Sequence, residues 1–100
     1  MIEIYVDLEK RCAKISGHAG HAESGKDVVC AGVTAITGAL INMVAERGDP
    51  DWVNFGPKEE ISVRFPAEWP GLENCLEMAL TGWRGIEEEY PENVRIVQPE

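Results

Sequence analysis

The feature that most constrains the fold is a long run, residues 28–45, that contains no charged side chain. Its length approaches that of a membrane span, but Gly32 and Thr37 interrupt the apolar pattern, and the flanking segments are typical of soluble strands. Asp27 is a favoured helix N-cap just before the run, and Gly48 can serve as a C-cap after it. We therefore expect a helix of a soluble domain, which other elements must cover on most sides.

A second copy of the chain would supply part of that cover. A sheet can pack on one side of the helix and a second helix on another, which leaves small positions such as Ala31, Ala35 and Ala39 without a partner. A domain of 100 residues also buries only a modest core by itself. We therefore predict a homodimer that uses this apolar surface.

The rest of the chain predicts one α+β domain spanning residues 1–100. A helical stripe of apolar residues over 72–90 ends before Pro91, which predicts a second helix. The short link at residues 9–11 predicts a hairpin. The element order is then ββαββαβ, with two helices packed in one layer on a mainly antiparallel sheet. The expected strands are residues 2–8, 11–16, 51–55, 60–65 and 94–97.

Composition narrows the class of partner and the compartment. A formal net charge of −9 argues against direct binding of nucleic acid, because phosphate contacts need clustered Lys and Arg. The charge suits a basic polypeptide partner, although solubility alone would also account for it. The three cysteines are scattered singly, which argues for a reducing cytoplasm rather than a disulfide framework. The charged, alternating N-terminus is unlike a signal or transit peptide.

The chemistry of the chain concentrates just before and inside the first turn of the long helix. His18 and His21 lie on a glycine-rich loop, and Cys30 follows the expected cap at Asp27. The backbone N–H groups and the dipole at a helix start favour a thiolate, which is the nucleophilic form of cysteine. A histidine from a nearby loop could take up the thiol proton. This is the minimum apparatus for nucleophilic catalysis.

Two other interpretations of these residues stay open. A free cysteine on an apolar helix is usually a core residue, and a loop histidine is usually solvated. A metal site built from His18, His21 and Cys30 is also conceivable, but it lacks a fourth ligand at any recognised spacing. Cys12 lies on the more polar face of an expected strand. Cys75 falls on the apolar stripe of the second expected helix, so we predict that it is a core residue. We expect no metal and no cofactor.

Two short motifs flank the polar part of this loop. Gly17-His18-Ala19 stands before it, and Gly-Lys-Asp-Val-Val-Cys-Ala-Gly, residues 25–32, stands after it. Together they resemble the signature of the Prp family, the small bacterial cysteine proteases that process a ribosomal protein. The resemblance extends to the N-terminal strands, the long helix and the acidic segment near the C-terminus, so it covers nearly the whole chain. It also implies a homodimer.

The resemblance implies roles for particular residues. The nucleophile of the family falls on Cys30 and its catalytic histidine on His18, while His21 lies in the variable part of the loop. The aspartate of the family matches Asp27, which would either orient His18 or cap the helix. The family usually has a serine a few residues after the cysteine, and in this chain Thr34 stands at that position. The expected substrate-binding positions are Gly17, Ala31 and Thr34.

The implied function is a cysteine endopeptidase that acts during ribosome maturation. It would remove the N-terminal extension of the twenty-seventh protein of the large ribosomal subunit, and the family cuts after an aromatic pair in a short hydrophobic motif. His18 would take the proton of Cys30 and later protonate the leaving amine. We expect the backbone N–H groups of Cys30 and Ala31 to stabilise the oxyanion, although an Asp27 cap on Cys30 would compete for one of them.

Two functions of other classes remain as alternatives. The first is a non-catalytic, dimeric ribosome-assembly factor that binds a basic ribosomal protein without cutting it. The second is a small metal-binding or redox-sensing protein that uses His18, His21 and Cys30.

Overall fold

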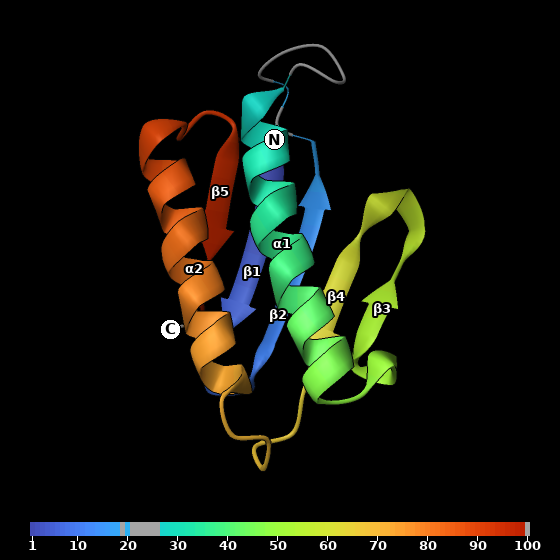
Figure 1. Cartoon of the computed structure of the whole chain (residues 1–100). Helices are drawn as coiled ribbons and strands as arrows, with labels where there is room; N and C mark the ends of the chain where they lie inside the picture. Colours follow the sequence, from blue (N-terminus) through green and yellow to red (C-terminus); the bar gives the residue numbers. More distant parts are fainter. Residues whose placement is uncertain (19, 21–26, 100) are drawn as a thin grey trace.

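The computed structural model describes residues 1–18, 20 and 27–99, and its elements follow one another in the predicted order (Figure 1). Two short 3-10 turns, η1 (Pro50–Trp52) and η2 (Pro57–Glu59), flank the third strand. The order ββαββαβ is confirmed. The main elements are β1 (Ile2–Asp7), β2 (Cys12–Gly17), α1 (Val28–Arg47), β3 (Val53–Phe55), β4 (Ile61–Arg64), α2 (Leu72–Glu89) and β5 (Val94–Val97).

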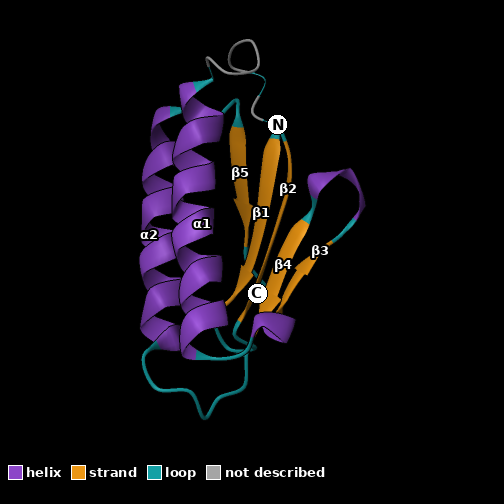
Figure 2. Cartoon of the chain, turned by 45° about the vertical axis from the view of Figure 1, so that its right-hand side comes forward, coloured by secondary structure: helices purple, strands orange, loops and turns teal. Residues whose placement is uncertain are grey.

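The five strands form one sheet in the order β3-β4-β2-β1-β5. β5 runs parallel to β1, and the other neighbouring pairs are antiparallel. Both helices lie on the same face of this sheet (Figure 2), which confirms the two-layer α+β fold. The predicted hairpin is also present, since β1 and β2 pair in antiparallel fashion. The Asp7 side chain accepts a hydrogen bond from the Lys10 N–H at 2.9 Å and so closes the turn between them.

The core lies between the sheet and the helices. Ile2, Ile4 and Val6 alternate along β1 and are buried, while Glu3 and Tyr5 between them are exposed on the open face of the sheet. α2 contributes a helical stripe of buried residues, and its Trp83 is completely buried. The stripe consists of Leu72, Leu76, Ala79, Leu80 and Trp83.

α1 packs on the sheet with one face and on α2 with another. Gly82 of α2 permits the second contact, because a Cβ at that position would lie 2.8 Å from Cδ1 of Ile36. This close packing offsets the free energy that a glycine costs in the interior of a helix. Only 28% of the most apolar window of α1 is buried, and Ala31, Ala35 and Ala39 are exposed. Within a single chain, the other elements therefore leave much of α1 exposed, although we expected them to cover it on most sides.

By length and composition, α1 is the only helix in the described ranges that could cross a bilayer, with a mean hydropathy of 2.0. Here α1 packs on the sheet instead, and its own Val29, Val33 and Val44 are buried in the core. An apolar central helix of a folded domain passes the same compositional test.

Several predicted strand boundaries differ from the observed ones by one or two residues. β1 ends at Asp7 rather than at residue 8, β2 covers Cys12–Gly17 rather than 11–16, and β4 ends at Arg64 rather than at residue 65. β3 begins at Val53 rather than at Asp51, because the Asp49 side chain accepts a hydrogen bond from the Asp51 N–H at 2.8 Å and Pro50 starts the 3-10 turn η1. The strand expected from residue 60 begins at Ile61, since Glu60 closes η2. Local turn geometry shortens both strands.

Candidate active site

β2 delivers His18 to the end of the sheet next to the start of α1. Gly17, its last residue, pairs with Ile2 of β1 and has a φ of +87°. A side chain at this position would collide with the Met1 carbonyl oxygen, so only glycine allows the chain to leave the strand in this way. His18 follows immediately and is exposed. The rigid hairpin thus fixes the backbone from which the histidine projects.

The start of α1 positions Cys30. Asp27 has an extended backbone, and its Oδ1 accepts a hydrogen bond from the Cys30 N–H at 3.0 Å. Of the two roles proposed for Asp27, the structure therefore shows the capping role. Cys30 is half-buried in the first turn and packs against the edge of the core. The cysteine is thus held rigidly while its side chain stays accessible.

The backbone donors expected for an oxyanion are already in use. The Cys30 N–H binds the Asp27 side chain, and the Ala31 N–H binds the Asp27 carbonyl oxygen at 3.0 Å. Both N–H groups that we expected to serve an oxyanion are thus bound to Asp27 in this structure, and their role with a substrate stays a prediction.

Cys30 and His18 line one cavity of about 230 Å³ that runs along α1 beside β2 and β4. Its walls are mostly apolar, and Gly17 and Thr34 also border it. Ala31 is exposed on α1 and is not part of the lining. His21 lies outside the described residues. The apolar wall consists of Ile2, Ile15, Val33, Ile41 and Ile61, with Thr37 and Gly38 between them.

Sequence reasoning named none of the apolar residues that line this cavity as site residues, and it also missed a carboxylate in the lining. Glu59 lies in η2, and its Oε2 is 2.8 Å from Nε2 of His18. Both side chains are largely exposed, at 72% for His18 and 73% for Glu59. Glu59 is one carboxylate among many, and only the pairing register of β2 with β4 could have indicated its position. That pairing is not visible in a local pattern.

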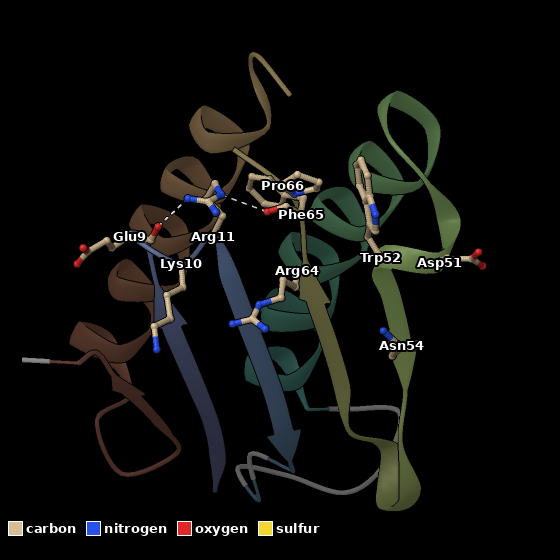
Figure 3. A pocket seen from close by; sticks show the side chains of 9 residues that line it. All are labelled: Glu9, Lys10, Arg11, Asp51, Trp52, Asn54, Arg64, Phe65 and Pro66. Atoms are coloured by element: carbon tan, nitrogen blue, oxygen red, sulfur yellow. Dashed lines mark hydrogen bonds between the residues drawn. The ribbon is translucent and has the colours of Figure 1, made fainter. Parts of the chain in front are cut away.

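A larger hollow of about 780 Å³ lies at the opposite end of the sheet, beyond the turn between β1 and β2 (Figure 3). None of the described cysteines or histidines lines it. The Arg11 guanidinium donates to the carbonyl oxygens of Phe65 and Glu9, so it ties the β1–β2 turn to the end of β4. Size alone would select this hollow, but Cys30 and His18 line the smaller cavity.

The described residues contain no group of three or more side chains that could together hold a metal ion. Cys12, Cys30 and Cys75 are all free thiols. Cys75, predicted as a core residue, packs against the core but is only half-buried.

The model of the family described as cysteine protease Prp matches residues 1–95. The chain belongs to the Prp family. A ribosomal processing cysteine protease Prp from Staphylococcus aureus is 34% identical over 102 residues, which cover 95% of this chain and 94% of the relative. The Bacillus subtilis protein of the same name is 28% identical over 95 residues, and the match covers 83% of this chain and 80% of the relative. The chain is therefore a cysteine protease of a ribosomal-processing family.

Solved Prp structures share the whole fold. The S. aureus protease in complex with a covalently linked product peptide superposes with a TM-score of 0.86 at 26% identity, covering 99% of this chain and all of that one. The same protease with a substrate peptide gives a TM-score of 0.79 at 25% identity, with the same coverage. The match over the full length includes α1, so this helix is an integral part of the Prp domain.

Proposed function

We propose that this chain is a cysteine endopeptidase that removes the N-terminal extension of the twenty-seventh protein of the large ribosomal subunit, with Cys30 as nucleophile and His18 as base. The observation that carries the proposal is that Cys30 and His18 line one cavity in a member of the Prp family. A covalently linked product peptide in the S. aureus relative supports a nucleophilic mechanism.

In this mechanism His18 takes the proton from Sγ of Cys30, and the thiolate attacks the scissile carbonyl carbon. The tetrahedral intermediate collapses to a thioester as His18 protonates the leaving amine. A water molecule, deprotonated by His18, then hydrolyses the thioester and releases the thiol. Asp27 supports these steps by holding the first turn of α1, because its side chain binds the Cys30 N–H.

The cavity suits a short hydrophobic segment of a substrate peptide. Its walls are mostly apolar, so burial of aromatic or aliphatic side chains there would contribute roughly 25 cal/mol per Å². Gly17 borders the cavity at the end of β2, and Thr34 borders it on α1. Ala31 lies on the exposed side of α1. We place the substrate in the cavity itself, next to Gly17 and Thr34.

The charge of the chain suits a basic substrate protein in the cytoplasm. α2 exposes several carboxylates, including Glu73, Glu77 and Glu88. Glu87 of the same helix is half-buried, and its Oε2 accepts a hydrogen bond from the Ile96 N–H at 2.7 Å, which ties β5 to α2. With a net charge of −9, direct contact with nucleic acid is not part of this proposal.

The test is incubation of the purified protein with a peptide that spans the N-terminal extension of the host's own ribosomal protein, read by mass spectrometry. Cleavage at a single bond is the expected result. Binding without cleavage would contradict the proposal and favour the non-catalytic assembly factor. If the host protein has no such extension, the proposed substrate is wrong.

The choice of histidine is tested by two single variants. His18→Ala is expected to lower kcat by about 10²–10⁴-fold, because the general base is lost. His21→Ala, the matched control from the same loop, is expected to retain most activity. The reverse pattern in the peptide-cleavage assay would show that His21 is the base.

We also propose that two copies associate through the exposed face of α1. Ala31, Ala35 and Ala39 are exposed along this helix, and Met78 of α2 is 77% exposed. Light scattering is expected to give twice the chain mass of 11.0 kDa. Ala35→Glu, which places a charge on this face, is expected to give monomers, since an unpaired charge is costly to bury. A monomeric native protein would contradict this proposal.

A further inference from the structure

Glu59 reaches His18 because of the pairing between β2 and β4. The strands are antiparallel, and their last described pair is Ile15 with Ile61. Continuing this register by two residues places Glu59 opposite Gly17, the residue before His18. η2 packs against β2 at this point, and Nε2 of His18 lies 2.8 Å from Oε2 of Glu59. The contact therefore arises from the sheet itself.

The backbone of Glu59 is held in an unfavourable conformation. Its φ is +61°, a left-handed value that costs a non-glycine residue free energy. The turn persists because the Gly56 N–H donates to the Glu60 carbonyl oxygen at 2.7 Å and the Glu60 N–H to that of Pro57 at 3.3 Å. Glycine would fit this backbone better than glutamate. The shape of the turn therefore does not explain why this position carries a carboxylate.

We propose that Glu59 is the positioning residue for His18, an inference that rests on the proposed function. Its carboxylate accepts the hydrogen on Nε2, which fixes the tautomer with a lone pair on Nδ1. Nδ1 is then the nitrogen that takes the proton from Sγ of Cys30 across the shared cavity. The residue that the family resemblance suggested for this task, Asp27, instead holds the Cys30 N–H.

Glu60 supplies a matched control on the other face of the sheet. Its Oε1 lies 3.4 Å from Nζ of Lys14, so it forms an ion pair of its own. Lys14 lies between the buried Ala13 and Ile15 of β2, so this ion pair is on the open face of the sheet. Glu60 does not line the cavity that contains Cys30 and His18. Glu60→Gln thus removes the same charge from the neighbouring residue without touching the proposed site.

The experiment compares peptide cleavage by the native chain, Glu59→Gly, Glu59→Gln and Glu60→Gln. Glu59→Gly is expected to lower kcat about 10- to 100-fold with KM nearly unchanged, because His18 loses its orientation. Its melting temperature should be equal or higher, since the strain at φ +61° is relieved. Glu59→Gln should regain part of kcat, because its amide oxygen still accepts from Nε2. Native kcat in Glu59→Gly, or an equal loss in Glu60→Gln, would overturn the proposal.

A spectroscopic measurement separates this proposal from the proposed substrate. Two-bond ¹H–¹⁵N NMR spectra report which ring nitrogen of neutral His18 carries the hydrogen, without any peptide. We expect the hydrogen on Nε2 in the native chain and in Glu60→Gln, and a mixture of tautomers in Glu59→Gly. If the native chain cuts no peptide but shows this tautomer, only the proposed function fails. A mixed tautomer in the native chain would overturn the role of Glu59.

Discussion

Cys30→Ala is expected to reduce cleavage of the substrate peptide to the background rate. Removal of a catalytic nucleophile eliminates the covalent pathway, and such losses reach about 10⁴–10⁶-fold in kcat. The general base alone cannot replace a nucleophile, so we expect a larger loss here than for His18→Ala. Mass spectrometry of the peptide after long incubation measures the residual activity.

The same variant should keep the fold and bind the peptide. Cys30 is half-buried at the edge of the core, and the Asp27 cap binds its backbone N–H rather than its side chain. Cys12→Ala is the matched control, because Cys12 is also half-buried but lies on β2 away from the cavity lining. Retained cleavage by Cys30→Ala, or equal loss in Cys12→Ala, would exclude Cys30 as the nucleophile.

Periodicity predicted the architecture of this chain well. The alternation of Ile2, Ile4 and Val6 predicts the buried face of β1, and the apolar stripe of α2 predicts the helix that packs against it. Both patterns are local, because burial repeats every second residue in a strand and about every 3.6 in a helix. The order ββαββαβ follows from them.

Non-local contacts were beyond the reach of such patterns. Glu59 meets His18 only because β4 pairs with β2, and Glu87 binds the Ile96 N–H only because β5 returns beside α2. Both carboxylates look like ordinary surface charges in the sequence. The Ala31 N–H was expected to serve an oxyanion, but the observed helix start uses it for the Asp27 carbonyl oxygen. These details depend on the folded backbone.

Trp83→Ala is expected to cause the largest loss of stability, about 3–5 kcal/mol. Trp83 is completely buried on the core-facing stripe of α2, and Phe65 and Leu76 are other fully buried side chains of the core. For a domain of 100 residues this corresponds to a melting temperature at least about 12 °C lower. Thermal unfolding followed by circular dichroism measures the shift.

Trp83→Phe separates the packing of this residue from its polar atom. Within the described part of the chain, Nε1 of Trp83 is the buried side-chain nitrogen or oxygen that has no hydrogen-bond partner. Leaving such a donor unpaired costs about 1–3 kcal/mol, and phenylalanine removes the donor while filling most of the space. We therefore expect Trp83→Phe to cost no more than about 2 kcal/mol. A loss as large as that of Trp83→Ala would contradict this expectation. It would mean that Nε1 has a hydrogen-bond partner in the folded protein and that this hydrogen bond stabilises the fold.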